Sequence, residues 1–120
     1  MNTKKLLSKH YIGTLVTKNP DLLLEGTKCQ KYIIKYLDEI GIQVLGDQLQ
    51  VFPNRSFTLL IALAESHISI HTWPERHTIQ LDVFLCNYNH DNTNKCAAIY
   101  QSICKYFNPI EEDTITIDRP

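Results

Sequence analysis

Residues 65–75 carry an unusual density of side chains that could perform chemistry. The segment reads Glu-Ser-His-Ile-Ser-Ile-His-Thr-Trp-Pro-Glu, so hydroxyls, imidazoles and carboxylates surround a few apolar positions. Its alternation of apolar and polar residues is typical of a strand with two different faces. Imidazole titrates near neutral pH and can transfer protons, and a hydroxyl beside a base can act as a nucleophile. The segment therefore indicates a reactive site on a strand.

A second alternating segment, residues 78–86, ends in Cys86. Its apolar positions occupy one face, and Asp82, Phe84 and Cys86 occupy the other. We expect His71 and Cys86 to share one surface of a sheet if the two strands pair in a suitable register. A thiol with a pKa near neutrality can return a proton to a reacting carbon.

These two segments resemble the self-cleaving region of the small prokaryotic S-adenosylmethionine decarboxylase proenzymes. The resemblance extends from about His10 to Cys86, and its diagnostic parts are residues 65–75 and 82–86 and the distance between them. In that family a Glu-Ser peptide bond breaks itself and the serine becomes a pyruvoyl group. The resemblance implies cleavage between Glu65 and Ser66, which gives a β chain of residues 1–65 and an α chain of residues 66–120. Ser66 is then the precursor of the cofactor.

The resemblance also implies a chemical role for three of these residues. Ser66 Oγ attacks the carbonyl of Glu65 and converts the amide into an ester. His71 is the expected processing base, which removes the α-hydrogen of Ser66 so that the ester leaves by β-elimination. The mature pyruvoyl ketone forms a Schiff base with the substrate amine and accepts the electron pair released with carbon dioxide. Cys86 is the expected proton donor to the α-carbon.

Three further positions match family residues outside the reacting centre. Thr58 stands where the family has a serine that assists processing, and its extra methyl restricts the rotamer, which predicts slower maturation. By the same resemblance Phe52 stacks on adenine and Glu75 holds the ribose hydroxyls. The implied reaction is decarboxylation of S-adenosylmethionine for spermidine synthesis. Trp73 is expected to pack rather than react.

Alternative functions stay open at this point. Residues 76–78 read Arg-His-Thr where the family commonly has an aromatic residue and a glycine, so a pyruvoyl-dependent decarboxylase of ornithine or arginine is the closest rival. An unprocessed, non-catalytic regulatory homologue is another. A zinc site built from His67, His71 and Cys86 is disfavoured, because strand residues four apart lie about 13 Å from each other. The sequence thus predicts no metal.

Composition excludes several classes of protein. The chain has 120 residues, a mass of 13.9 kDa and a net charge of −1 with no basic run, so nucleic acid is an unexpected partner. Residues 57–64, the longest apolar run, cannot cross a bilayer, and residues 1–7 do not form a signal-peptide core, which predicts a cytoplasmic protein with no membrane contact. The cysteines, none in a C-x-x-C pair, are expected to be reduced: Cys29, Cys86, Cys96 and Cys104.

The elements that position these residues follow from periodicity and turn residues. A helix is predicted from an apolar stripe that includes Cys29, Ile33 and Leu37 and closes at Gly41, and a second helix spans 91–107. Strands are predicted at 10–17, 57–64, 67–73, 78–86 and 114–117, with a strand or hairpin at 42–52. The pattern indicates a single α+β domain over residues 1–120, a two-layer sandwich with helices on one face of a mostly antiparallel sheet. The resemblance implies a homodimer with active sites at or near the subunit interface.

Overall fold

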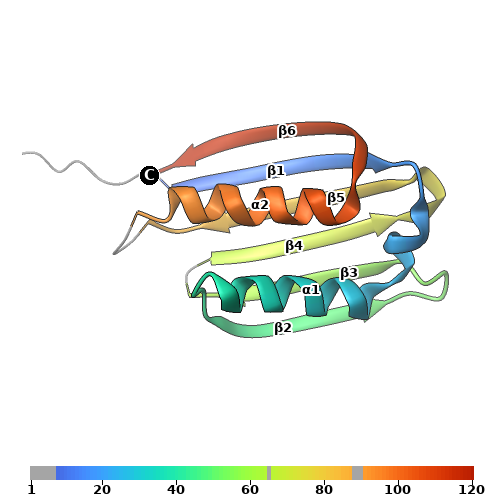
Figure 1. Cartoon of the computed structure of the whole chain (residues 1–120), viewed down its shortest axis with the longest axis horizontal. Helices are drawn as coiled ribbons and strands as arrows, with labels where there is room; N and C mark the ends of the chain where they lie inside the picture. The colour runs from blue at the N-terminus through green and yellow to red at the C-terminus, as the bar shows by residue number, and fades with distance from the viewer. Residues whose placement is uncertain (1–7, 65, 88–90) are drawn as a thin grey trace, which may run out of the picture.

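The computed structural model describes residues 8–64, 66–87 and 91–120. Within these residues the chain forms six strands, two α-helices and two short 3-10 helices. The strands make one sheet in the order β2-β3-β4-β5-β1-β6, and every neighbouring pair is antiparallel. Both α-helices lie on the same face of this sheet (Figure 1). The predicted two-layer α+β architecture is therefore confirmed.

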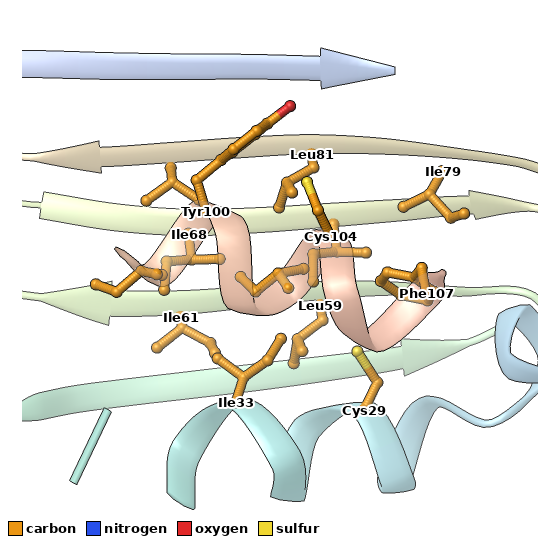
Figure 2. Close-up of a cluster of buried hydrophobic side chains, with 14 of the residues drawn as sticks. Cys29, Ile33, Leu59, Ile61, Ile68, Ile79, Leu81, Tyr100, Cys104 and Phe107 are labelled. Atoms are coloured by element: carbon orange, nitrogen blue, oxygen red, sulfur yellow. The ribbon is translucent and has the colours of Figure 1, made fainter. Parts of the chain in front are cut away.

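The first helix forms where the apolar stripe predicts it. Strand β1 (Ser8–Thr17) leads through a 3-10 helix, η1 (Pro20–Leu24), into helix α1 (Gly26–Glu39). Cys29, Ile33 and Leu37 are at most 1% exposed. Figure 2 shows Cys29 and Ile33 pointing toward the sheet. Gly41 then adopts a φ of +79°, a left-handed conformation that glycine reaches without steric cost and that ends the helix.

Residues 42–52 form one strand and not a hairpin of their own. Strand β2 (Val44–Val51) pairs with β3 (Phe57–Leu63), and its register shifts between Val44 and Gly46. The hairpin turn between β2 and β3 contains Arg55, whose φ is +71°. Asn54 Oδ1 stabilises this turn by accepting hydrogen bonds from Ser56 N at 3.1 Å and Ser56 Oγ at 2.6 Å.

The two segments that carry the predicted chemistry form adjacent strands. Strand β4 (Ser66–Trp73) is joined to β5 (Thr78–Leu85) by a second 3-10 helix, η2 (Pro74–Arg76). The register pairs His67 with Phe84 and His71 with Gln80. Cys86 lies just beyond the end of β5, although the alternation predicted a strand through that residue.

The C-terminal part of the chain closes the sheet. Helix α2 (Thr93–Phe107) ends at Asn108, which takes a left-handed conformation with a φ of +49°. Strand β6 (Pro109–Arg119) is much longer than the predicted 114–117, and it pairs only with β1 at the edge of the sheet. An edge strand buries little surface, so its sequence lacks the strict apolar alternation from which strand length is read.

The hydrophobic core lies between the sheet and the helices. Figure 2 shows side chains of α1 and α2 pointing onto the apolar face of the strands. Tyr100 of α2 crosses over Gly13 of β1, and its hydroxyl hydrogen-bonds Thr114 Oγ1 at 2.8 Å. No described helix combines the length and the hydropathy that crossing a membrane would require.

The opposite face of the sheet is covered by neither helix (Figure 1). This open face carries the polar side chains of β4 and β5, and several apolar ones reach solvent beside them. Leu60 is 46% exposed, Ile115 is 56% exposed and Ile117 is 41% exposed. Their positions in the register place all of them on the open face, because each neighbour along its strand faces the helices.

Candidate active site

Ser66 and Cys86 lie together at one end of β4 and β5. The backbone N–H of Cys86 donates a hydrogen bond to Ser66 Oγ at 2.7 Å. The Cys86 carbonyl in turn accepts a hydrogen bond from Asn92 Nδ2 at 3.0 Å, which ties this loop to the start of α2. Both Ser66 and Cys86 are half-buried. The arrangement places a fixed hydroxyl beside a thiol-bearing residue, and we name this the serine-end cluster.

Thr58 and His71 form a second cluster on the open face. They are direct cross-strand partners in the β3–β4 register, and Thr58 Oγ1 lies 3.0 Å from His71 Nδ1. That contact engages Nδ1 of the imidazole, so Nε2, on the other side of the ring, is the nitrogen left to exchange a proton. We name this pair the histidine-end cluster.

A cavity of about 350 Å³ adjoins the histidine-end cluster. Thr58, His71, Phe52 and Trp73 are among its lining residues. Its volume lies within the range of roughly 300–1,000 Å³ that is typical of small-molecule sites. Trp73 is 37% exposed here and forms part of the cavity wall, and it is not packed in the core as expected.

Glu75 does not line this cavity. It lies on η2, the turn that follows Trp73, and its side chain is exposed. The next residue, Arg76, places its guanidinium 5.0 Å from the centre of the Trp73 ring. A charged turn therefore borders the aromatic wall.

The serine-end and histidine-end clusters lie far apart in one chain. Ser66 and His71 are five residues apart on the extended strand β4, a separation of about 16 Å. Cys86 is six residues beyond Gln80, the partner of His71 on β5, a separation of about 20 Å. His71 faces the open side of the sheet, whereas Cys86 lies just beyond the end of β5, and the register puts the two residues at opposite ends.

Thiols elsewhere in the chain are unsuited to acid–base work. Cys29, Cys96 and Cys104 are buried free thiols that face the core. Burial raises the pKa of Cys29 to about 12 and the pKa values of Cys96 and Cys104 to about 11. They stay protonated at neutral pH, which leaves Cys86 as the cysteine in contact with the candidate site.

Comparison with known proteins decides the family. A family model described as S-adenosylmethionine decarboxylase matches residues 9–120, nearly the whole chain. The chain belongs to the S-adenosylmethionine decarboxylase family. A curated S-adenosylmethionine decarboxylase proenzyme from Hydrogenobaculum sp. is 31% identical over 115 residues, covering 96% of this chain and 83% of the relative. Another, from Archaeoglobus fulgidus, is 25% identical over 114 residues, covering 95% and 98%.

A solved structure carries the same fold as this S-adenosylmethionine decarboxylase family member. The crystal structure of the adenosylmethionine decarboxylase from Aquifex aeolicus superposes with a TM-score of 0.82 at 24% identity, covering 97% of this chain and 92% of that one. The sheet order and the placement of both helices therefore belong to a known architecture.

Sequence reasoning about this S-adenosylmethionine decarboxylase family member missed three residues at the serine end. Asn92 holds the Cys86 carbonyl, and its role depends on a loop contact that no periodicity reveals. His10 and Asp82 lie beside His67 on the open face. Both stand at polar positions of alternating strands, a signal that marks the face but not the contact between three strands. Burial, and next the charge of His10, lower the pKa of His67.

Glu65, the residue before the predicted cleavage point, lies outside the described residues.

Proposed function

We propose that this chain is a self-processing proenzyme that cleaves itself between Glu65 and Ser66 and then decarboxylates S-adenosylmethionine. The observation that carries the proposal is the 2.7 Å hydrogen bond between Cys86 N and Ser66 Oγ, within a chain whose residues 9–120 match the family. It holds the hydroxyl of the predicted nucleophile beside the residue predicted to handle the substrate proton.

The processing step uses side chains of the chain itself. Ser66 Oγ attacks the Glu65 carbonyl carbon, the C–N bond breaks, and an ester links the two parts of the chain. Removal of the Ser66 α-hydrogen by a base then expels the Glu65 carboxylate and leaves dehydroalanine. This tautomerises to an imine, and water hydrolyses the imine to a ketone with release of ammonia. Ser66 is the residue consumed, so the cofactor needs no outside source.

The residues around Ser66 fit such a group. Ser66 is the first residue of strand β4, and the half-buried Cys86 lies beside Ser66. When formed, the pyruvoyl ketone supplies the electron sink for loss of carbon dioxide. In this proposal Cys86 holds the proton that the substrate α-carbon takes up, and the hydrogen bond from its backbone N–H to Ser66 Oγ keeps the residue beside position 66.

His71 can act as the base only if it comes from a second copy of the chain. Within one chain it lies about 16 Å from Ser66 along β4, well beyond proton-transfer distance. Two copies can stack with their open sheet faces together, related by a two-fold axis that lies between the sheets and is perpendicular to the strands. The strands of one sheet then run opposite to those of the other. This arrangement sets the serine end of one sheet over the histidine end of its partner. We therefore place each active site between Ser66 and Cys86 of one chain and the partner's Thr58 and the partner's His71.

The open sheet face supports this homodimer. The described helices leave it uncovered, and Leu60, Ile115 and Ile117 expose apolar surface on it. A second sheet packed on this face would bury these side chains, as in sandwiches whose inner faces interdigitate. The half-buried histidine-end cluster and its cavity would then face the serine end of the other copy.

The cavity beside His71 is the proposed substrate site. Phe52 and Trp73 give it two aromatic walls, and aromatic faces attract both an adenine ring and a sulfonium cation. Phe52 stacks on adenine in this proposal, and Glu75 holds the ribose hydroxyls from the turn after Trp73. The relatives reported above are named for S-adenosylmethionine and lend no support to ornithine or arginine as substrate, nor to a non-catalytic role. The product then serves as the aminopropyl donor for spermidine synthesis, in the cytoplasm.

Mass spectrometry under denaturing conditions tests the proposal. We expect two fragments that meet between residues 65 and 66, with a carbonyl at the new N-terminus that hydroxylamine modifies. Ser66→Ala should give one chain of 13.9 kDa with no carbon dioxide release from carboxyl-labelled S-adenosylmethionine. A single uncut wild-type chain, or an active Ser66→Ala protein, would contradict the proposal.

A further inference from the structure

Three strands bring two imidazoles and a carboxylate together on the open face. His67 of β4 and His10 of β1 are both cross-strand partners of Phe84 on β5, one on each side. Asp82 lies two residues before Phe84 and has the same facing. Donor atoms of His10, His67 and Asp82 all lie within 4.8 Å of one another. The Phe84 ring lies between His10 and His67 in the register, with its centre 5.5 Å from the centre of the His10 ring and 5.8 Å from that of the His67 ring.

One of these atoms is buried and makes no hydrogen bond within the described part of the chain. His10 Nε2 is buried, and it has no hydrogen-bond partner among the described residues. The Asp82 carboxylate oxygen nearest to it is 3.5 Å away, and the His10 side chain is only 12% exposed. A buried polar nitrogen that makes no hydrogen bond is costly, and a bound metal ion would satisfy it. The His10 and His67 rings meet edge to face, with centroids 5.8 Å apart.

We propose that His10, His67 and Asp82 form a binding site for a divalent transition-metal ion such as Zn²⁺ or Co²⁺. Two imidazoles and one carboxylate are a donor set that open zinc sites use, and the remaining positions are left to water or a ligand. Donors at about 2.1 Å in tetrahedral geometry stand roughly 3.4 Å apart. The donor atoms must therefore move closer by about 1.4 Å at most. His67, which is exposed, can supply that movement by side-chain rotation.

A positively charged side chain, Arg119, lies near the proposed metal site. Arg119 of β6 places its guanidinium 5.1 Å from the centre of the Phe84 ring, on the same face. Its charge disfavours a second cation nearby, whereas the Asp82 charge favours one. Removal of the Arg119 charge should therefore strengthen metal binding, an effect that damage to the fold would not produce. This site shares only His67 with the zinc set His67, His71 and Cys86, whose members the register separates.

Titration of the metal-free protein with Co²⁺ tests the proposal through the visible absorption of bound cobalt. We expect one Co²⁺ per chain, and at least about 10-fold weaker binding for His10→Gln, His67→Gln and Asp82→Asn. His77→Gln and His71→Gln are matched controls that remove imidazoles outside the cluster, and both should bind as tightly as the wild type. Arg119→Gln should bind more tightly. Circular dichroism of each variant checks its fold. Substitution of His67 should disturb the fold least, because this side chain is exposed.

The same titration on Ser66→Ala separates this inference from the proposed self-cleavage, because metal binding needs no processing. Absence of a cobalt spectrum in both proteins would overturn the proposal. So would binding that survives all three cluster substitutions, or binding lost in His71→Gln with a thiolate charge-transfer band that Cys86→Ser abolishes.

Discussion

Two inactive variants should restore self-cleavage when they form mixed dimers. The first variant, Ser66→Ala, lacks the nucleophile and keeps His71. The second, His71→Asn, lacks the base and keeps Ser66. In a mixed dimer with shared sites, Ser66 of the second chain meets the intact imidazole of the first, so one of the two sites is complete. The other site lacks both groups.

The separation along β4 fixes the size of the effect. Ser66 and His71 are about 16 Å apart in one chain, so neither variant can complete a site alone. Random pairing of equal amounts makes about half of all dimers mixed, and about half of the chains that carry Ser66 should then be cut. If each chain instead used its own His71, no chain in the mixture would be cut.

The assay is co-expression of two tagged chains, followed by denaturing mass spectrometry to score each chain separately. A reciprocal control mixes the wild type with the double variant Ser66→Ala/His71→Asn. Shared sites predict that every mixed dimer is inactive, so cleavage of the wild-type chains falls to about half. Full cleavage of the wild-type chains in that control, together with no cleavage in the first mixture, would refute the shared site.

Substitutions at three further positions test individual contacts. Cys86→Ala should slow carbon dioxide release by roughly 100-fold, since a positioned acid contributes that much, and should leave cleavage largely intact; normal turnover would require another acid. Thr58→Val keeps the shape of the side chain but removes the 3.0 Å contact to His71, and should slow cleavage roughly 3- to 10-fold, whereas Thr58→Ser should cleave at least as fast as the wild type. A β-carbon on Gly13 would lie 1.9 Å from Tyr100 Oη, so Gly13→Ala should lower the free energy of unfolding in urea by about 1–3 kcal/mol. Added Tyr100→Phe should recover part of that loss, and an unchanged denaturation midpoint in Gly13→Ala would contradict the close approach.

Periodicity predicted the elements whose burial is one-sided. The stripe of Cys29, Ile33 and Leu37 marked α1, and the alternation around Ile68 and Ile70 marked β4, because burial against a single layer imposes a period on the sequence. Periodicity predicted only residues 114–117 of strand β6. Most of its side chains are exposed, and its length is set by hydrogen bonds to β1. The predicted strand 78–86 included Cys86, but β5 ends one residue earlier, at Leu85.

The candidate site divides in the same way. The sequence, through its family resemblance, predicts a hydroxyl, an imidazole and a thiol at positions 66, 71 and 86 as the reacting groups, and these roles stay predictions. Their separation could not be predicted, because it depends on the pairing of His71 with Gln80 and of His67 with Phe84. Asn92 and His10 enter through contacts between segments far apart in the chain, about which local sequence carries no information.

The register of β4 therefore links maturation to assembly in the proposed enzyme. Five residues of extended strand separate Ser66 from His71 by about 16 Å, so the proposed nucleophile and base cannot meet within one chain. A chain that has not found its partner then holds Ser66 beside Cys86 with His71 out of reach, and its backbone stays intact. Cleavage begins only when the second sheet arrives, so the reactive ketone is generated inside a covered interface and is shielded from bulk solvent and from cellular amines. Dilution below the dimer dissociation constant before processing should accordingly stop cleavage, whereas a site contained in one chain would cleave at a rate independent of concentration.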